Sequence, residues 1–473
     1  MPEASPRSRA ALLAGPALFA LLLAIPAPGG FSPAAWQVAA LTLWMGTWWL
    51  TEALPLPVTA LLPLLVLPAL GVAGLEPVSA QFAHPVMWLF FGGFALGLAI
   101  EKHGLHQRLV ATVLRVSGHG PRAALGGMML ATAALSMWIT NTAATLTMLP
   151  AGRALIARWP ADDAAAAGFA RAVLLGVAYA ATLGGLCTLV GTAPNAFLAA
   201  YLQDRYGIEI GFARWMLIGL PLSGILLLVT WRLLGWQQRL PAGAPSLGLA
   251  TAPGAWSTSE RRLAVVFGLV VAAWLLRPLA PWAWAKQLGD SGVAVAGALT
   301  LFLLPSGDDA RRPLLDWRDV ERLPWGVLVM FGGGLALAEA VSSSGLAQAL
   351  GGALAPFTDG SQWLTLAAVV ASIVLISEFA SNMAVAAAFL PVVGAIAAGG
   401  DGDILALAIP AGLAASCAFM MPVGTPPNAL AFSQGVLKVR DMARAGLYLN
   451  LLSWLLLTLA LPPWLKVLFN GHA

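Results

Sequence analysis

Charged residues are scarce in this chain, since only 10% of its 473 residues are Asp, Glu, Lys or Arg. A soluble domain needs a polar surface, yet 59% of these residues are hydrophobic and the mean hydropathy is +0.82. A lipid bilayer is the solvent that suits such a composition. The scarcity of charge therefore excludes a string of soluble domains and predicts one polytopic membrane bundle.

Cysteine and histidine are also rare, with two and five copies. Cys187 and Cys417 lie inside apolar stretches and indicate neither a disulfide framework nor a metal cluster. The histidines lack metal-ligand spacing, and no nucleophile stands with an acid/base pair at membrane depth. The basic residues, which give a net charge of +4, lie at the ends of apolar segments. We therefore expect that the protein is not an enzyme and that it binds neither an organic cofactor nor nucleic acid.

Apolar runs between charges and Pro/Gly clusters divide the chain into segments. These are residues 10–26, 34–52, 54–72, 82–116, 122–155, 168–203, 212–235, 261–278, 290–305, 320–350, 363–397, 403–435 and 440–469. The first segment could be a signal peptide, but the next span follows closely and no convincing cleavage site is visible, so a retained helix is favoured.

The distribution of basic residues predicts the topology. With the N-terminus cytoplasmic and the C-terminus outside, 20 of the 25 Lys and Arg residues lie inside. The five placed outside are Arg205, Arg214, Arg277, Lys286 and Lys466. This positive-inside bias favours about eleven spans and two re-entrant hairpins, in a bacterial inner membrane.

An internal repeat is the strongest signal in the sequence. Ser136, Asn141, Ala143, Leu149 and Pro150 match Ser377, Asn382, Ala384, Leu390 and Pro391 at an offset of 241. Gly191-Thr192-Ala193-Pro194-Asn195-Ala196 matches Gly424-Thr425-Pro426-Pro427-Asn428-Ala429 at an offset of 233. An odd number of spans per copy would turn the second copy upside down, which is the inverted-repeat plan of many secondary transporters.

The predicted fold is therefore an all-α polytopic membrane protein with inverted repeats, re-entrant hairpins and broken helices. Residues 1–75 form N-terminal, mainly scaffold helices. The first repeat is 76–235, with a hairpin at 122–155 and a broken helix at 168–203. A cytoplasmic loop at 236–260 leads to the second repeat, 261–473, with a hairpin at 363–397 and a broken helix at 403–435.

Each repeat carries two polar interruptions, a hairpin tip around Asn141 or Asn382 and a Gly-Thr-x-Pro-Asn break. Backbone turns at membrane depth survive only when they are buried in protein or line a wet cavity. Proline removes a donor and glycine permits close approach, so each break exposes a Gly carbonyl and starts a half-helix. Neutral oxygens suit a small hard cation, and the N-terminus of a half-helix suits an anion.

These two pairs of motifs, in order and spacing, resemble the divalent anion/sodium symporter family over residues of about 80–460. That family carries two Ser-Asn-Thr tripeptides at hairpin tips, each paired with a break of this type. The resemblance implies an elevator-type transporter, a homodimer in the lipid bilayer, that takes up a small anion with sodium ions. A C4-dicarboxylate such as succinate is the expected substrate, with citrate or sulfate as other members' substrates.

The resemblance also implies site residues. One sodium ion would be bound by Ser136, Thr140, Asn141 and the Gly191 carbonyl, and a second by Ser377, Ala380, Asn382 and the Gly424 carbonyl. The anion would contact Asn141, Thr142, Thr192, Asn382, Met383, Thr425 and Pro426. Thr140 replaces the signature Ser and keeps a hydroxyl. Met383 replaces the signature Thr and removes one, so a different or less polar anion stays open.

Other functions on the same fold stay open at this point. A cation-independent anion exchanger would need a fixed positive side chain near the tips, and none is visible near Asn141 or Asn382. A proton-coupled transporter or a metalloid-anion exporter would use Glu378, although a structural hydrogen-bonding role is favoured because its repeat partner is Met137. A channel is disfavoured because no symmetric filter is present.

Overall fold

The computed structural model describes residues 9–116, 120–159, 165–240, 254–307, 312–358, 361–399 and 403–469. Within these ranges the chain is helical, and its only strand-like feature is one isolated bridge between Pro305 and Pro313. Among the described residues, six helices are long and apolar enough to cross a bilayer. They are Leu75–Lys102, Ala166–Gly185, Phe212–Gln237, Thr258–Leu279, Trp325–Ser343 and Val439–Phe469. The predicted all-α class is confirmed, while the number of about eleven spans stays a prediction.

The N-terminal helices follow the predicted segments with two corrections, the division of one segment and a helix, α5 (Leu75–Ala80), that lies between two predicted segments. They are α1 (Arg9–Ala24), α2 (Pro33–Thr51), α3 (Leu56–Thr59), α4 (Leu62–Ala69) and α5 (Leu75–Ala80). The segment expected as one run at 54–72 is divided into α3 and α4. Each of these short helices has a proline in its first turn. A missing N–H costs nothing at that position, whereas the same proline in the interior of one continuous helix would break it.

Two further predicted segments also divide, and both divide at a glycine. The run at 82–116 forms α6 (Pro85–Lys102) and α7 (Leu105–Val116), and the run at 320–350 forms α15 (Trp317–Val320), α16 (Trp325–Ser343) and the start of α17 (Leu346–Thr358). Gly104 and Gly345 lie between the paired helices with φ of 73° and 82°. Because L side chains rarely adopt this conformation, each glycine lets the chain turn. We did not anticipate either turn.

The hairpins have the same register in both repeats. The first consists of α8 (Pro121–Ser136) and α9 (Asn141–Ile156), and the second of α18 (Gln362–Ser377) and α19 (Asn382–Ala398). The first helix of each hairpin ends at its serine, and the second begins at its asparagine. The four residues between them form the turn, so the matching Ser and Asn flank both tips.

Both Gly-Thr-x-Pro-Asn segments interrupt a helix. The first break separates α10 (Ala166–Gly185) from α11 (Ala193–Tyr206), and the second separates α20 (Ile404–Ala414) from α21 (Pro426–Phe432). Prolines occupy the first turn of α11 and of α21. A proline is tolerated there because the first N–H groups of a helix have no partner within it.

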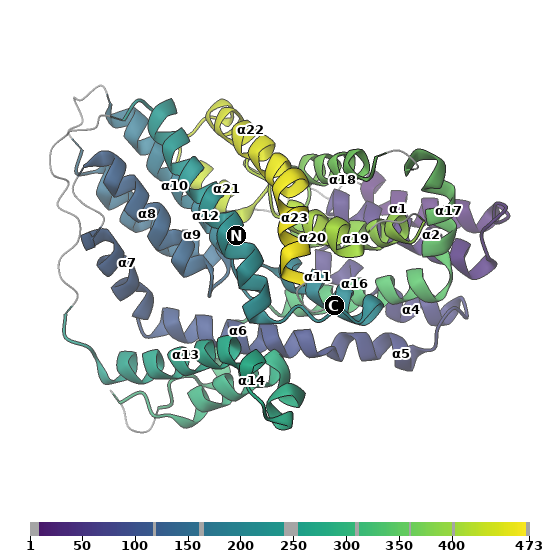
Figure 1. Cartoon of the computed structure of the whole chain (residues 1–473), viewed down its shortest axis with the longest axis horizontal. Helices are drawn as coiled ribbons and strands as arrows, with labels where there is room; N and C mark the ends of the chain where they lie inside the picture. Colours follow the sequence, from purple (N-terminus) through teal and green to yellow (C-terminus); the bar gives the residue numbers. More distant parts are fainter. Residues whose placement is uncertain are drawn as a thin grey trace.

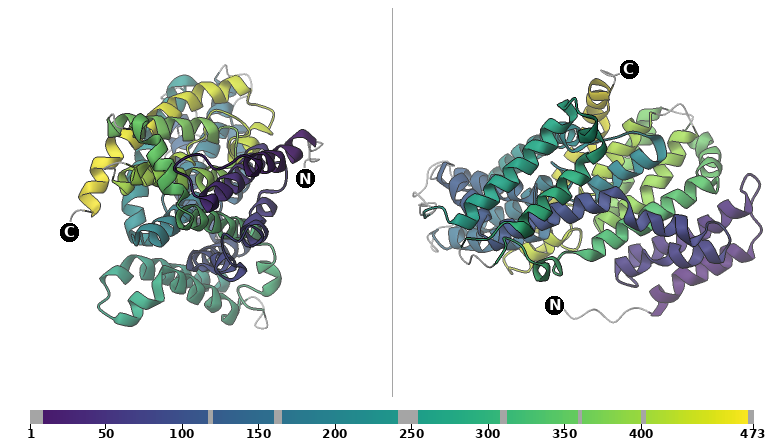
Figure 2. Two further views of the ribbon diagram at one scale, coloured as in Figure 1. Left: turned by 90° about the vertical axis from the view of Figure 1, so that its right-hand side faces the viewer. Right: turned by 90° about the horizontal axis from the view of Figure 1, so that it is seen from below.

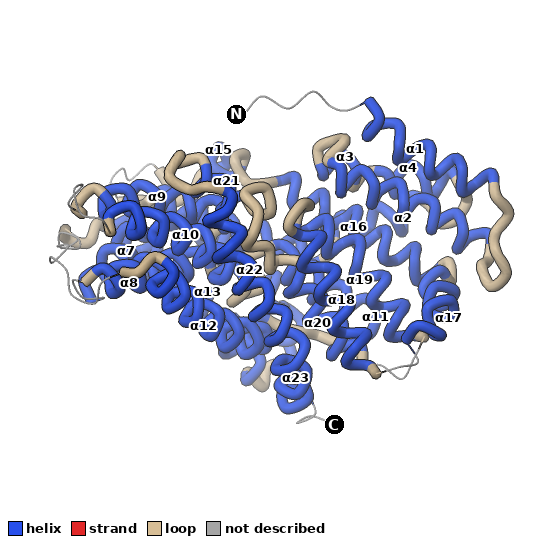
Figure 3. Tube along the Cα trace, turned by 90° about the horizontal axis from the view of Figure 1, so that it is seen from above, coloured by secondary structure: helices blue, strands red, loops and turns tan. Residues whose placement is uncertain are grey.

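The helices after each break pack mainly against the other repeat. Helix α21 contacts α9 and α10 of the first repeat, whereas α11 contacts α16, α19 and α20 of the second. In Figure 1, α8, α9, α10 and α21 lie toward one end, and α11, α16, α19 and α20 toward the other. The N-terminal helices α1, α2 and α4 form the far end beside α16 and α17 (Figures 2 and 3).

The remaining helices connect and flank these units. They are α12 (Phe212–Gln237), α13 (Thr258–Leu276), α14 (Ala283–Leu303), α22 (Val439–Leu455) and α23 (Leu461–Phe469), the last two joined by a π-helical turn at Leu456–Ala460. Of the loop predicted at 236–260, residues 241–253 lie outside the described residues. So do residues 1–8 and 470–473, and the orientation of the termini stays a prediction.

Glycine allows close packing at the repeated Phe-Gly-Gly motifs. A Cβ at Gly92 would collide with the backbone of Ala294 on α14, and one at Gly333 would collide with the backbone of Ala60. Each of these glycines therefore lets two chain segments approach more closely than an alanine would. The glycines of Phe91-Gly92-Gly93 and Phe331-Gly332-Gly333 therefore serve close packing.

Candidate functional site

The first tip (residues 136–142) is built around Asn141. The hydroxyl of Ser136, at the end of α8, lies 2.8 Å from the Asn141 amide group. With its nitrogen turned toward the first break, this amide also donates to the carbonyls of Ala181 (3.2 Å) and Gly191 (3.3 Å). One hydroxyl, one carboxamide and two carbonyls thus converge at the point where hairpin and break meet.

The first break (residues 186–192) is held closed by its own polar groups. Asn195 is 1% exposed, and its Nδ2 donates to the carbonyls of Gly185 (2.9 Å) and Thr188 (2.7 Å). The hydroxyl of Thr188 accepts from Gly191 N (3.0 Å) and donates to the carbonyl of Met137 in the hairpin tip (2.6 Å). Hairpin and break are therefore tied together by one neutral side chain.

Asn428 closes the second break (residues 415–425) in the same way. It is fully buried, and its Nδ2 donates to the carbonyls of Ala418 (3.3 Å) and Met421 (3.0 Å). These acceptors are the repeat partners of Gly185 and Thr188 at the offset of 233. The final Asn of each motif therefore donates to carbonyl groups at or after the end of the interrupted helix.

The second tip (residues 377–383) is tied to its break by a different residue. Glu378 is 2% exposed and accepts hydrogen bonds from three successive backbone N–H groups, those of Phe419, Met420 and Met421. The side chain of Asn450 on α22 donates to it as well (2.6 Å). Its environment fits the structural hydrogen-bonding role that we favoured for it.

The structure brings part of the predicted sodium sets together. In the first set, Ser136, Asn141 and the Gly191 carbonyl lie within hydrogen-bonding reach, and Thr140 caps α9 through Ala143 N (3.3 Å). In the second set, Ser377 instead donates to the carbonyl of Ile373 (2.8 Å), and Ala380 is buried. The Oδ1 atom of Asn382 is buried with no partner among the described residues.

At the second tip it is the hairpin backbone that approaches the break. A Cβ at Gly424 would lie 3.3 Å from the carbonyl oxygen of Glu378 and 3.1 Å from its Oε2. No hydrogen bond among the described residues joins Ser377, Ala380 or Asn382 to Gly424. The four predicted ligands of the second ion are therefore less closely gathered than those of the first.

The predicted substrate residues differ in exposure. Thr142 and Thr192 are half-buried at the starts of α9 and α11, and Pro426 is exposed at the start of α21. Thr425 is 3% exposed and caps α21 by accepting from Asn428 N (3.2 Å). Met383 is 6% exposed, so most of its side chain packs inside the protein.

Fixed charge lies outside the tips and breaks, with the exception of Glu378. The ion pairs among the described residues are His84–Asp204, Lys102–Asp319, Arg108–Glu260, Arg205–Glu339 and the pairs of Arg277 with Glu209 and Asp290. None involves a residue of either tip or break. The anion would therefore meet hydroxyls, amides and helix N-termini.

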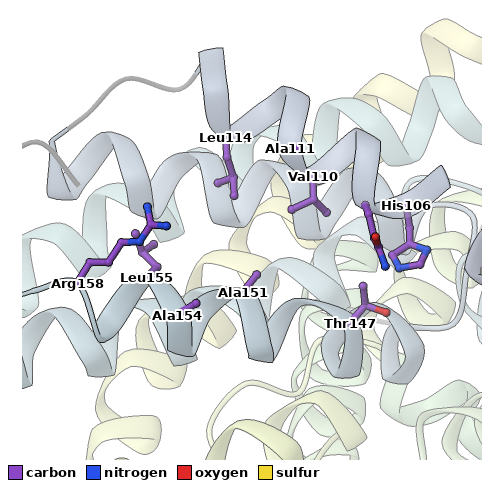
Figure 4. Close-up of a pocket in the computed structure, with 10 residues that line it drawn as sticks. His106, Val110, Ala111, Leu114, Thr147, Ala151, Ala154, Leu155 and Arg158 are labelled. Atoms are coloured by element: carbon purple, nitrogen blue, oxygen red, sulfur yellow. The ribbon is translucent and has the colours of Figure 1, made fainter. Parts of the chain in front are cut away.

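Two cavities among the described residues lie away from the predicted substrate residues. One, of about 260 Å³, separates α7 from α9 and has His106 and Arg158 toward its two ends (Figure 4). The other, also about 260 Å³, lies among α18, α20 and α23. Neither is lined by a residue of either tip or break, so neither locates the substrate.

Sequence reasoning missed four side chains that hold these pairs together, and considered a fifth in two roles. Asn195 and Asn428 stand in the repeated motifs, and their matching positions were the available signal. Thr188 and Asn450 carry no such signal, because they act on residues 51 and 72 positions away. Glu378 was considered as a proton site or a hydrogen-bonding residue.

A family model described as "Sodium:sulfate symporter transmembrane region" matches residues 7–470. The chain belongs to this family. It is accordingly a membrane transporter and not an enzyme. The match also confirms the resemblance seen in the paired tips and breaks.

Two curated relatives of this chain have more specific names. The chain is 36% identical over 476 residues to a protein of Staphylococcus saprophyticus named "Sodium-dependent dicarboxylate transporter SdcS", covering 96% of this chain and 92% of the relative. A Staphylococcus aureus (strain USA300) protein of the same name is 36% identical over 466 residues, covering 95% and 89%.

A solved structure shares the fold. The Alcanivorax borkumensis YdaH transporter, described as having an unusual topology, aligns with a TM-score of 0.57. The alignment covers 83% of this chain and 89% of that chain at 16% identity. At this identity the likeness concerns architecture alone, and it supports a polytopic transporter fold.

Proposed function

We propose that this transporter couples the uptake of a small dicarboxylate, such as the C4 compound succinate, to sodium ions. The observation that carries the proposal is the convergence of oxygens at the first tip and break. The nitrogen of the Asn141 amide faces the Ser136 hydroxyl and the Ala181 and Gly191 carbonyls at 2.8 to 3.3 Å, and rotating the amide would bring its oxygen to the same place beside them. Facing carbonyl oxygens repel one another unless a cation or an N–H lies between them.

The names of the relatives support the choice of cation and substrate. Proteins 36% identical over most of their length are named sodium-dependent dicarboxylate transporters. Uncharged oxygen ligands fit a small hard cation better than they fit a proton relay, which needs titratable groups. We therefore assign sodium to both tip-and-break pairs, with Ser136, Thr140, Asn141 and Gly191 in one set and Ser377, Ala380, Asn382 and Gly424 in the other.

The anion would bind between the two pairs. Helices α9, α11 and α19 begin at the tips and the first break, and their first N–H groups lack partners within the helix. Asn141, Thr142, Thr192, Asn382, Thr425 and Pro426 are the residues that we assign to its carboxylates. Met383 is the exception, because a thioether cannot donate a hydrogen bond.

We infer an elevator-type movement in a homodimer of the bacterial inner membrane. Support comes from the inverted plan of the repeats and from the way in which α11 and α21 each pack against the opposite repeat. Such a plan permits one bundle to carry a fixed site past another. The N-terminus in the cytoplasm and the C-terminus outside follow from the positive-inside bias.

Uptake of labelled succinate into proteoliposomes tests the function. We expect uptake when an inward sodium gradient is imposed and none when potassium replaces sodium. Asn141→Ala serves as the inactive variant and a protein-free vesicle as the background. Uptake that ignores sodium but needs an anion inside the vesicle would assign a cation-independent exchanger instead. Sulfate and citrate, tested in parallel, would reassign the substrate if they replaced succinate.

A further inference from the structure

A cavity of about 260 Å³ lies among α18, α20 and α23, away from the tips and breaks. Helix α18 begins the second hairpin and α20 begins the second broken helix. Helix α20 contacts both of the others. Three of the lining residues are polar, namely Gln362, Asp403 and Lys466, and the others are apolar. None of them belongs to the proposed sodium or anion sites, so the function described so far gives this cavity no role.

The cavity has a polar mouth and an apolar floor. Each helix provides a polar residue at its end and an apolar residue four positions further in, which is about one helical turn or 6 Å. The polar member of each pair is exposed, and the apolar member is buried. The pairs are Gln362 with Leu366, Asp403 with Leu407, and Lys466 with Pro462. A ligand with one polar and one apolar end matches this arrangement.

The two charges at the mouth have opposite signs and do not neutralise each other. Neither Asp403 nor Lys466 belongs to an ion pair among the described residues, whether with the other or with a third side chain. Asp403 uses its Oδ1 to cap α20, accepting from Leu405 N (2.9 Å). A carboxylate and an ammonium group that share a mouth without pairing complement a ligand that carries both signs.

Two tryptophans place this mouth at the surface of the bilayer. Trp363 lines the cavity and is 47% exposed, and Trp464 in α23 is 40% exposed. Exposed tryptophans of membrane proteins gather at the level of the lipid headgroups, and lysines near helix ends extend to that level. The floor around Leu366 and Leu407, each 3% exposed, then lies at the depth of the acyl chains.

We propose that this cavity binds a zwitterionic phospholipid with a primary ammonium group, phosphatidylethanolamine. The lipid phosphate lies against the Lys466 ammonium group, the ethanolamine ammonium donates to the Asp403 carboxylate, and an acyl chain covers Leu366 and Leu407. Phosphatidylcholine fits less well because its trimethylammonium group has no N–H to donate. Phosphatidylglycerol fits less well because its headgroup carries no positive charge to face Asp403. The bound lipid joins the second hairpin to α20 and α23.

Native mass spectrometry of the purified full-length protein tests the site. Each preparation is titrated with phosphatidylethanolamine, phosphatidylcholine or phosphatidylglycerol, all with the same acyl chains. Asp403→Asn removes the carboxylate charge and keeps an oxygen that can cap α20, and Lys466→Gln removes the ammonium group. The matched control is Lys286→Gln at an exposed lysine of α14, which lines neither this cavity nor the one between α7 and α9.

The two charge variants should change lipid selectivity in different ways. The wild type should bind phosphatidylethanolamine about fivefold or more tightly than either other lipid. Asp403→Asn should weaken phosphatidylethanolamine about fivefold and leave phosphatidylcholine unchanged, because only the primary ammonium loses its acceptor. Lys466→Gln should weaken all three lipids by a similar factor, because they share the phosphate. Lys286→Gln should bind like the wild type.

Several results would overturn the proposal. Equal binding of the three lipids would show that the acyl chain alone is recognised, and strongest binding of phosphatidylglycerol would assign an anionic lipid instead. An unchanged affinity for phosphatidylethanolamine in Asp403→Asn, or an equal loss in Lys286→Gln, would remove the headgroup contacts. All three substitutions change exposed side chains, so unfolding temperatures in lipid-free detergent should match that of the wild type. The inference does not depend on which ions or anions are transported.

Discussion

At the scale of single residues, the matching asparagines of the two tips differ in what they contact. Asn141 contacts a hydroxyl and two carbonyls, whereas the Oδ1 of Asn382 has no partner among the described residues. The two asparagines match in sequence, but they should therefore contribute unequally to the free energy of unfolding. The two positions can be separated by measuring folding and transport side by side.

Replacing each asparagine by alanine should give unequal stability and equal loss of function. Asn141→Ala removes up to three hydrogen bonds and should lower the free energy of unfolding by about 1–3 kcal/mol. Asn382→Ala should cost less than about 1 kcal/mol, since it relieves a buried unpaired oxygen. Thermal unfolding in detergent checks the first quantity and sodium-driven uptake the second. Equal destabilisation by both variants would contradict the contacts described for Asn141.

Met383→Thr should bind a dicarboxylate more tightly, because it restores a hydroxyl where the family signature has one. Since Met383 is 6% exposed, the smaller side chain should also cost about 1–3 kcal/mol of stability. Met383→Leu, which conserves volume without a donor, is the control. Titration calorimetry with succinate measures the affinity. An affinity unchanged in Met383→Thr would remove position 383 from the anion site.

At the scale of elements, the tips differ in how they are supported. Trp138 stacks on Phe212 of α12 (6.0 Å between ring centres) and meets the edge of Phe267 of α13 (4.9 Å). Its repeat partner, Phe379, is 67% exposed. The first hairpin is thus fixed to neighbouring helices by aromatic packing, whereas Phe379 makes no ring contact with any residue that the structure describes.

Alanine at these two positions should reveal the difference. Trp138→Ala should destabilise the protein by about 2–4 kcal/mol, because it removes large apolar contacts. Phe379→Ala should change stability by no more than about 0.5 kcal/mol. Thermal unfolding of both variants decides the matter. A large loss of stability in Phe379→Ala would show that another surface covers the second tip.

The breaks themselves should depend on their asparagines. Asn195→Leu leaves the Gly185 and Thr188 carbonyls without these donors, at a cost of about 2–4 kcal/mol in stability. Asn428→Leu leaves the Ala418 carbonyl without its donor, at a cost of about 1–3 kcal/mol, because the Met421 carbonyl still accepts from Gly424 N. Ser433→Ala, a change at the exposed residue directly after α21, serves as the control and should have little effect. The unfolding temperatures of the three variants test this prediction. If the asparagine variants lose no more stability than Ser433→Ala, the asparagines do not stabilise the breaks.

Much of this architecture could be predicted from the sequence, and the reasons lie in local patterns. The Ser-Asn pairs and the Gly-Thr-x-Pro-Asn motifs located tips and breaks because serine, asparagine and proline act on their own neighbouring backbone. The turns at Gly104 and Gly345 were not foreseen, since a lone glycine does not reveal its φ. The tie from Glu378 to Phe419–Met421 was not foreseen either, because it joins residues that are distant in sequence.

At the scale of the whole molecule, the two repeats have the same architecture, and the half-helix after each break packs against the other repeat. Helix α21 lies with the first hairpin and α11 with the second, so the repeats interlock. Ion pairs also connect α11 to its surroundings: Asp204 with His84, and Arg205 with Glu339 on α16. A movement of the site relative to α6 and α16 would have to break these pairs.

The predicted topology can be tested by labelling single cysteines. Both native cysteines are buried, so they should react little with a membrane-impermeant maleimide. Lys286→Cys should be labelled from outside the cell and Arg239→Cys only after the membrane is opened, because both positions are exposed and lie on opposite sides in the predicted topology. If Arg239→Cys is labelled from outside and Lys286→Cys only after the membrane is opened, the topology is the inverse of the predicted one.

The account depends most on two sodium-binding pairs that face a shared anion, and the flux of sodium itself tests this. In proteoliposomes with equal sodium on both sides, an inward succinate gradient should drive uptake of isotopically labelled sodium, because coupling between two ligands is reciprocal. Asn141→Ala and Asn382→Ala should each abolish it. Succinate entry without any movement of sodium would contradict the central claim.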